Sequence, residues 1–177
     1  MQRVPNAEFE PALKQRLEEL WGNPPNLYRA LGNHPALAAA WTEFARGIRH
    51  ESKSPRELRE LMILRGAQLM RSEYEWAQHL KMARKCGVRE AQIAALADWR
   101  GSKEFDEREK AALLLAEAVT QANVTDQVYA EVSKHFGHAM FVELSLTAAF
   151  YAMVGRMLDA MRIQLEPEAR AYSPKLP

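Results

Sequence analysis

Residues 60–79 of the chain read Glu60-Leu-Met-Ile-Leu-Arg-Gly-Ala-Gln-Leu-Met-Arg-Ser72-Glu-Tyr-Glu75-Trp-Ala-Gln-His79. Apolar side chains recur here with helical period, and serine is a residue type that often caps the start of a helix. The pattern predicts one helix over 55–70 and a second over 72–86. Because the first is apolar on nearly all sides, we expect a buried central helix, with Glu60 as a carboxylate among apolar neighbours.

Outside these two helices, prolines and glycines separate segments of helical length and composition. No segment alternates apolar and polar residues for long enough to predict a strand. Further helices are predicted over 9–20, 25–31, 35–50, 89–98, 106–122, 125–136 and 138–164. The fold class is therefore all-α. At 177 residues, 47% of them hydrophobic, we expect a single domain over 1–177 with its core motif at about 55–100.

A weak internal repeat is visible when the chain is shifted by 83 residues. The shift lays Leu58-Arg59-Glu60-Leu61 over Phe141-Val142-Glu143-Leu144, and Gly155 falls on Ser72. We therefore expect a second half-repeat at about 138–165 that shares the helical scaffold without the polar cluster.

Charge and hydropathy exclude several classes of partner. The 24 Lys and Arg residues nearly balance the 23 Asp and Glu residues and form no basic block, so nucleic acid is not expected. The longest apolar stretch, around Leu144 to Val154, is too short to cross a bilayer, and Met1 to Pro11 is polar. We expect no membrane association and a cytoplasmic location.

Cysteine and histidine usage limits the chemistry. The single cysteine, Cys86, excludes a disulfide framework, a thiolate metal cluster and two-cysteine redox chemistry within one subunit. The five histidines are scattered without helical pairing, so a metal site is not expected. Cys86 precedes Gly87 near a helix end and is expected to pack as a small apolar residue.

Three polar residues share one stripe of the helix over 72–86. Ser72, Glu75 and His79 fall at i, i+3 and i+7. Glu75 and His79 can share a hydrogen bond at i, i+4, and Glu60 from the preceding helix could complete a small acid–base site. Histidine suits proton transfer because its pKa lies near neutrality, and burial raises the pKa of a glutamate toward the same range.

Structural interpretations of the same residues stay open. Ser72-x-x-Glu75 is also the pattern of a capping box, in which both side chains bond to the helix terminus. Glu60 could be half of a buried ion pair with Arg65 or Arg56, and His79 a satisfied interior histidine.

The motifs Arg59-Glu-Leu-x-Ile-Leu64, Tyr74-Glu-Trp-Ala-Gln-His79 and Ala83-Arg-x-x-Gly-Val88 resemble those of the carboxymuconolactone decarboxylase and AhpD-like superfamily. The similarity extends upstream to Asn26-Leu-Tyr-Arg-Ala-Leu31 and downstream to Phe141-Val-Glu-Leu144. The AhpD-like branch has Cys-x-x-Cys where this chain has Ser72 and Glu75. Because a serine oxygen cannot form a sulfenic acid or a disulfide, the chain is more similar to the decarboxylase branch.

That resemblance implies a cofactor-free decarboxylation of a small unsaturated or lactone carboxylic acid. In it, His79 and Glu75 would be the acid–base groups and Glu60 would orient the histidine. It also implies a homo-oligomer, commonly a trimer or a hexamer.

Two residues are candidates for binding the substrate. Arg156 could bind its carboxylate, because it lies in an apolar helix among Tyr151, Met153 and Met157, although it could also be an ordinary surface arginine. Ser72 is the second candidate. Two other functions remain possible: an AhpD-like hydroperoxide reductase that uses the lone thiol of Cys86, and a non-catalytic oligomeric protein that binds a ligand.

Overall fold

The computed structural model describes residues 2–172 and 176, and these residues form helices without a strand, which confirms the all-α prediction. In chain order the helices are α1 (Pro11–Trp21), α2 (Asn26–Leu31), α3 (Pro35–Arg46), the π-helical turn η1 (Gly47–Glu51), α4 (Arg56–Met70), α5 (Glu73–Cys86), α6 (Glu90–Ala95), the 3-10 turn η2 (Leu96–Asp98), α7 (Glu107–Thr120), α8 (Asp126–Ser133), α9 (His138–Met161) and α10 (Pro167–Tyr172). The sequence pattern missed α10 and did not distinguish η1 from the end of α3.

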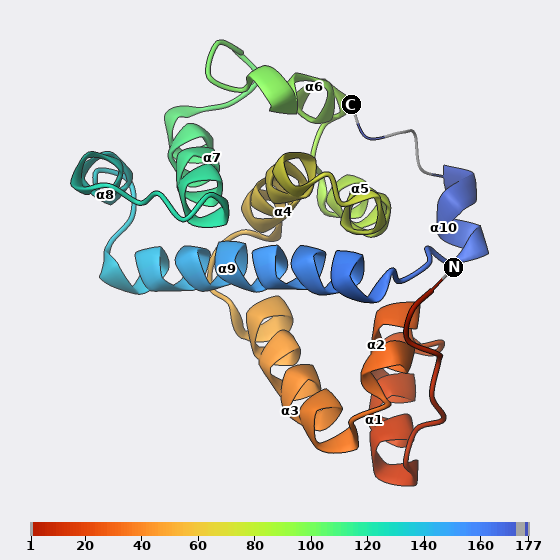
Figure 1. Cartoon of the computed structure of the whole chain (residues 1–177). Coiled ribbons are helices and arrows are strands. Elements are labelled where there is room, and N and C mark those ends of the chain that lie inside the picture. The colour runs from red at the N-terminus through yellow and green to blue at the C-terminus, as the bar shows by residue number, and fades with distance from the viewer. Residues whose placement is uncertain (1, 173–175, 177) are drawn as a thin grey trace.

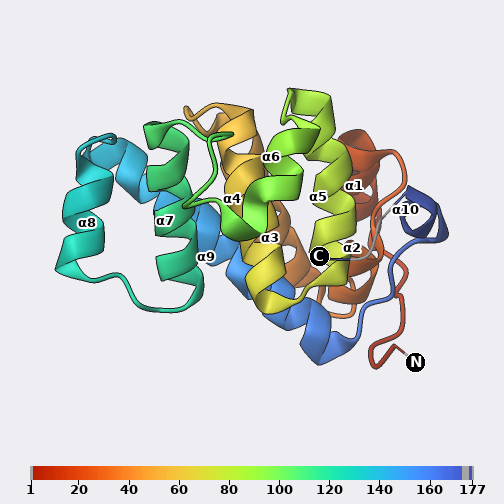
Figure 2. The ribbon, with the colours of Figure 1, turned by 90° about the horizontal axis from the view of Figure 1, so that it is seen from above.

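The long helix α9 divides the molecule into two parts (Figure 1). On one side lie α4, α5, α6 and α7, and on the other lie α1, α2 and α3, while α8 and α10 flank the two ends of α9. Seen from above, α4, α5 and α7 lie side by side across α9 (Figure 2).

Helix α4 is the central buried helix that its composition predicts. It packs against α5, α7 and α9, and Leu61, Leu64 and Ala67 are almost completely buried. At its N-terminus the carboxylate of Glu143, from α9, accepts hydrogen bonds from the backbone N–H groups of Lys53 (2.7 Å) and Ser54 (2.9 Å). A side chain 89 residues away thus fixes the segment that leads into the helix.

The hairpin of α4 and α5 is not repeated in the second half of the chain. The 83-residue shift places the turn at Met70–Ser72 over Met153–Gly155, which lies inside the continuous helix α9. Helix α4 ends where Arg71 adopts the left-handed conformation (φ 53°), whereas Val154, the residue that the shift places over Arg71, lies inside α9. The expected second half-repeat therefore keeps a helix but not the turn.

Helix α9 is longer than the apolar stretch identified in the sequence. By length and composition it could cross a membrane, with a mean hydropathy of 1.3 over its most apolar window, so the expectation of a stretch too short to do so is wrong. Half of that window is buried inside the fold, where α9 packs against α4 and α7. The core helix of a soluble protein meets the same criteria.

Candidate active site

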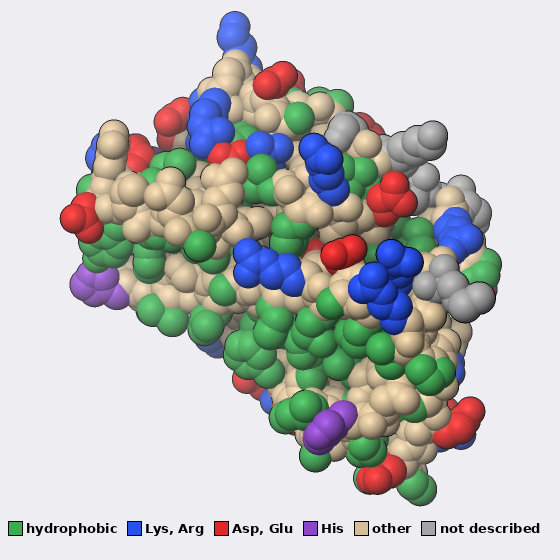
Figure 3. All heavy atoms as spheres, viewed as in Figure 1, with side chains coloured by type: hydrophobic (Ala, Val, Ile, Leu, Met, Phe, Trp, Pro, Cys, Tyr) green, Lys and Arg blue, Asp and Glu red, His purple; other side chains and the backbone are tan. Residues whose placement is uncertain are grey.

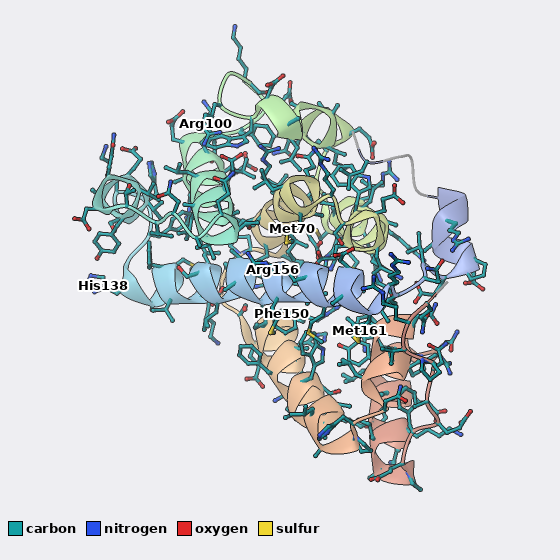
Figure 4. All side chains as sticks on the ribbon, viewed as in Figure 1. Met70, Arg100, His138, Phe150, Arg156 and Met161 are labelled. Atoms are coloured by element: carbon teal, nitrogen blue, oxygen red, sulfur yellow. The ribbon has the colours of Figure 1, made fainter. Side chains whose placement is uncertain are left out.

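A cavity of about 50 Å³ lies between the N-terminal helices, α5 and α9. Aromatic side chains dominate its walls, and Phe150 lies on the side of α9 that faces α3 (Figure 4). The polar side chains that line it are Arg49, Glu75, Gln78 and His79. The apolar and aromatic lining consists of Trp21, Pro25, Leu27, Tyr28, Trp41, Ala45, Tyr74, Met82, Phe150, Tyr151 and Val154.

The α4–α5 hairpin brings Glu60 and His79 together. Nδ1 of His79 lies 2.8 Å from Oε2 of Glu60, and both side chains are buried. Arg56 forms an ion pair with the other carboxylate oxygen. The predicted contact between Glu60 and His79 is therefore present. Of the two arginines considered as ion-pair partners of Glu60, Arg56 forms the pair, whereas Arg65 pairs with Glu117.

Burial and nearby charges set the protonation states of Glu60 and His79. Burial by itself would raise the pKa of Glu60, but His79 and Arg56 outweigh burial and lower it, so Glu60 is a carboxylate. Burial lowers the pKa of His79 despite the opposing effect of Glu60, so the imidazole is neutral at pH 7. Its Nδ1–H therefore donates to Glu60, and Nε2 keeps a lone pair that can accept a proton.

Glu75 is a buried carboxyl group in the wall of the cavity. It is 1% exposed, and neither carboxyl oxygen has a hydrogen-bond partner among the residues that the structure describes. Burial raises the pKa of Glu75 from its ordinary 4.5 to about 8, an effect that the Ser72 hydroxyl opposes. At neutral pH, Glu75 is therefore mostly a neutral acid that can donate a proton.

Ser72 caps α5 but lies outside the lining of the cavity. Its Oγ accepts a hydrogen bond from the backbone N–H of Glu75 at 3.4 Å. The reciprocal bond of a capping box is replaced, because the backbone N–H of Ser72 donates to the carbonyl of Ala67 at 2.9 Å. Only half of the box is formed, and this leaves the Glu75 carboxyl free to face the cavity.

Tyr151 adds a neutral hydroxyl to the same cavity. Its ring meets the His79 imidazole edge to face, with centroids 4.7 Å apart, and its hydroxyl has no hydrogen-bond partner in the described part of the chain. Burial raises the pKa of Tyr151 to about 12, so the phenol keeps its proton. The sequence placed Tyr151 only as a neighbour of Arg156.

Arg156 and Cys86 are not brought to the cavity. Arg156 is exposed on α9 (Figure 4). The preceding residues Val154 and Gly155 are buried, and Arg156 lies on another face of the helix. The prediction that Arg156 binds the substrate therefore has no support from this monomer. Cys86 is half-buried and donates to the carbonyl of Ala83 at 3.3 Å, and burial raises the pKa of its thiol.

Arg49 is the cation that sequence reasoning missed. It lies on the π-helical turn η1, where the sequence pattern predicted an ordinary helix over 35–50. Nothing in Gly47-Ile-Arg-His-Glu51 distinguishes this arginine from Arg46, which forms exposed ion pairs with Glu43 and Glu51. Only the geometry of the turn directs Arg49 into the cavity.

The segment before α10 closes the side of the cavity next to α5. The carboxylate of Glu166 accepts hydrogen bonds from the hydroxyl of Tyr74 (2.7 Å), from Nε2 of Gln78 (2.5 Å) and from the backbone N–H of Asn26 (2.6 Å). This segment and α2 thus hold two wall residues of α5 in place. Among residues 2–172 and 176, no group of three or more His, Cys, Asp or Glu residues is arranged to hold a metal ion.

Two sequence comparisons locate the chain among known proteins. The model of the "Carboxymuconolactone decarboxylase family" matches residues 35–118. The uncharacterized protein YdfG of Bacillus subtilis (strain 168) is 32% identical over 99 residues, which are 54% of this chain and 67% of that protein. The matched region 35–118 contains α4 and α5 and therefore Glu60, Glu75 and His79.

Solved structures share the fold. The apo debrominase Bmp8 is 23% identical and superposes with a TM-score of 0.79 over 91% of this chain and 89% of that one. A cysteine-to-alanine variant of Bmp8 has been crystallised with 2,3,4-tribromopyrrole. An uncharacterized peroxidase-related protein from Ralstonia eutropha JMP134, with an alkylhydroperoxidase AhpD core, is 16% identical with a TM-score of 0.82 over 95% and 94% of the two chains. At these identities the similarity is one of fold.

Proposed function

We propose that this chain, which belongs to the carboxymuconolactone decarboxylase and AhpD-like superfamily, is a cofactor-independent enzyme that decarboxylates a small unsaturated or lactone carboxylic acid. The substrate would lie in the aromatic cavity beside His79. Glu75 and His79 would be its catalytic acid–base groups, and Glu60 would position His79.

The observation that carries this proposal is the state of the Glu75 carboxyl. It is buried, has no hydrogen-bond partner among the described residues, and its pKa of about 8 keeps it protonated at neutral pH. A structural carboxyl would be expected to pair with a hydrogen-bond donor or a cation, because an unsatisfied buried polar group is costly. An unpaired acid next to a histidine with a free Nε2 is the arrangement that proton transfer requires.

The reaction that this geometry supports involves no oxidation or reduction and consumes one proton. The C–C bond to the substrate carboxylate breaks, carbon dioxide leaves, and the electron pair moves into the conjugated system as a dienolate. The O–H group of Tyr151 and the guanidinium of Arg49 are the donors in the cavity that could bind the dienolate oxygen. Glu75 then gives its proton to carbon, and a proton from water restores the acid.

Nε2 of His79 has a second role in this scheme. Since its Nδ1–H is held by Glu60, the imidazole can accept a proton from water or from a substrate hydroxyl and pass it to Glu75. The tautomer depends on Glu60 remaining ionised, and Arg56 contributes to that by pairing with it. Glu60 therefore acts through His79 and need not touch the substrate.

Peroxide reduction is the less supported alternative. It needs a thiolate, but Cys86 is not part of the cavity lining, and burial together with Glu60 and Glu57 raises the pKa of its thiol. Ser72 and Glu75 stand where a Cys-x-x-Cys pair would have to be. A non-catalytic ligand-binding protein would explain the cavity but not an unpaired buried acid in its wall.

The test is a paired assay of the purified protein. Decarboxylation would be followed on a panel of unsaturated lactone acids that includes 4-carboxymuconolactone, beside dithiol-dependent peroxide reduction. We expect turnover of at least one acid, its loss in His79→Ala, and its retention in His138→Ala, which removes an exposed histidine at the far end of α9. Peroxide reduction without decarboxylation would reject the proposal.

Assembly and location belong to the same proposal. The chain would form a homo-oligomer, a trimer or a hexamer, and act in the cytoplasm on a small molecule. In support, large apolar side chains gather over α9 and the adjoining part of α3 (Figure 3). Those exposed by 39% or more on these two helices are Leu37, Phe44, Val142, Leu146 and Met153.

A further inference from the structure

Arg49 carries a positive charge into the cavity without a carboxylate partner among the described residues. Its guanidinium stacks over the Trp21 ring, 4.2 Å from the centroid, and donates to the sulfur of Met82 at 3.3 Å. A thioether sulfur is a weak acceptor, while a guanidinium has five N–H donors that favour the oxygens of a carboxylate or phosphate. The hydrogen-bonding capacity of Arg49 is therefore largely unused.

A second arginine in this protein stacks on a tryptophan and also has a carboxylate partner. Arg100 also stacks on a tryptophan, with its guanidinium 4.3 Å from the ring centroid of Trp99, but it forms an ion pair with Glu117. The fold thus provides a carboxylate for that tryptophan-stacked arginine and, within residues 2–172 and 176, none for Arg49.

The backbone around Arg49 fixes its position. Its carbonyl accepts hydrogen bonds from Arg56 (3.4 Å) and Arg59 (3.3 Å), which holds the π-helical turn against the start of α4. Irregular helical turns of this kind are frequent at functional sites. The charges of the two supporting arginines are balanced, since Arg56 pairs with Glu60, and Arg59 lies 3.9 Å from Glu143.

The other side of the cavity carries the opposite charge. Glu166 lies behind Tyr74 and Gln78 and is held by neutral donors only, within the part of the chain that the structure describes. A carboxylate at the Arg49 side would be attracted, whereas a second carboxylate at the Tyr74 side would meet the negative charge of Glu166. His79 and Glu75 between them are neutral at pH 7 and balance no further anion.

The walls favour a flat ligand. Trp41 and Phe150 have ring centroids 4.9 Å apart, and Phe150 in turn packs edge to face on Tyr151 at 5.3 Å. These contacting rings give the cavity an aromatic wall, against which a conjugated or aromatic ring packs better than a puckered one. Phe150 and Tyr151 lie outside the region matched by the family model, as do Trp21 and Tyr28, so these walls are supplied by other parts of this chain.

We infer that Arg49 is the anion-binding residue of this cavity and that its ligand is a small flat molecule with a single negative charge, such as an aromatic or conjugated monocarboxylate. Calling that ligand the substrate rests on the proposed function, but the binding preference does not. By this inference 4-carboxymuconolactone, which carries two carboxylates, is a poorer ligand than a monocarboxylate of similar shape.

Binding requires the cavity to widen. A cavity of about 50 Å³ holds one or two water molecules but not a ring with a carboxylate. The contact between Arg49 and Met82 is the one to open, because methionine is flexible and its sulfur is easily replaced as an acceptor by a carboxylate oxygen. Arg49 would then turn from Met82 to the ligand.

The test is a calorimetric titration at pH 7 with three probes of one shape: benzoate, its neutral analogue benzamide, and the dianion terephthalate. We expect wild-type protein to bind benzoate at least about tenfold more tightly than either of the others. Arg49→Gln should remove the preference for benzoate over benzamide. The matched control Arg156→Gln removes the same charge from the exposed face of α9 and should keep the preference.

Three results would overturn the inference: no binding of benzoate to the wild type, equal binding of benzoate and benzamide, or an unchanged preference in Arg49→Gln. None of these measurements needs turnover. A protein that decarboxylates no acid but loses its benzoate preference in Arg49→Gln would reject the proposed function and keep the inference. An active enzyme with an unchanged preference would do the reverse.

Discussion

The carboxylate of Glu60 and the imidazole of His79 are 19 residues apart in the chain and 2.8 Å apart in the fold. This contact sets the tautomer of the histidine and so places the free lone pair on Nε2. Arg56 forms an ion pair with the second oxygen of Glu60 and keeps the carboxylate ionised. In the proposed mechanism this pair is a preset base rather than a structural ion pair alone.

Glu60→Gln is expected to lower kcat by at least about a hundredfold, because an amide can donate to Nδ1 and move the imidazole proton to Nε2. Since glutamine fills the same space, the protein should stay folded, with a loss of roughly 1–3 kcal/mol from the broken contact with Arg56. Steady-state kinetics and thermal unfolding measure the two effects. Glu57→Gln, on the exposed side of α4, is the control. Unchanged kcat in Glu60→Gln would remove Glu60 from the mechanism.

The raised pKa of Glu75 predicts that the free energy of unfolding depends on pH. Its pKa is about 8 in the fold and near 4.5 when exposed, so between these values the folded state binds one more proton than the unfolded state. The free energy of unfolding should therefore fall by about 1.4 kcal/mol per pH unit through this interval, and the contribution of Glu75 is lost above pH 8. Glu75→Gln should remove this slope. Urea unfolding at pH 5 and pH 8 measures this slope. The control is Glu73→Gln, which changes an exposed neighbour. Equal slopes in the wild type and in Glu75→Gln would contradict the prediction.

Gly155→Ala is expected to reduce activity without unfolding the protein. A Cβ atom at this position would lie 2.6 Å from Oε2 of Glu75 and 2.8 Å from Cε of Met70, so both flexible side-chain ends must move. Their displacement offsets the gain of about 1 kcal/mol that alanine brings to a helix, and the Glu75 acid is shifted from its place. Gly66→Ala, where the nearest atom is 3.6 Å away, should keep full activity. Kinetics of the two variants would show the difference, and equal activity in both would argue against Glu75 as the acid.

Cys86→Ser should leave decarboxylation unchanged within about twofold. The thiol lies outside the cavity lining and bonds to the backbone of its own helix at Ala83. Peroxide consumption measured in parallel should be equally low in both proteins, because burial keeps the thiol protonated. A loss of peroxide consumption in the serine variant would revive the hydroperoxide reductase hypothesis.

The exposed apolar residues of α3 and α9 predict an oligomer that a charged side chain on this face would dissociate. Leu146 is 46% exposed near the middle of this face, and a glutamate there would have to be buried without a partner in any interface that covers it. We expect sedimentation to show an oligomer for the wild type and monomers for Leu146→Glu. Val124→Glu, at an equally exposed position beyond α7, should stay assembled. A monomeric wild type would reject the proposed assembly.

The sequence by itself determined the helical elements and part of the site. Periodic burial is a local property, so the α4–α5 hairpin could be read from residues 55–86, and with it the proximity of Glu60 to His79. The resemblance to a superfamily came from the same short motifs. Helix ends were placed within a few residues, because prolines, glycines and capping serines act on their immediate neighbours.

Only the tertiary structure decided which polar groups lack partners and where they point. Glu75 has no hydrogen-bond partner for its carboxyl in the described part of the chain, because Ser72 uses its backbone N–H on Ala67 and α9 covers the carboxyl at Gly155. Arg49 faces the cavity because a π-helical turn rotates it inward, while Arg156, the arginine that sequence reasoning chose, points to solvent. Burial, and with it protonation, depends on groups that are distant in sequence. No local pattern specifies such groups, and only the packed helices bring them together.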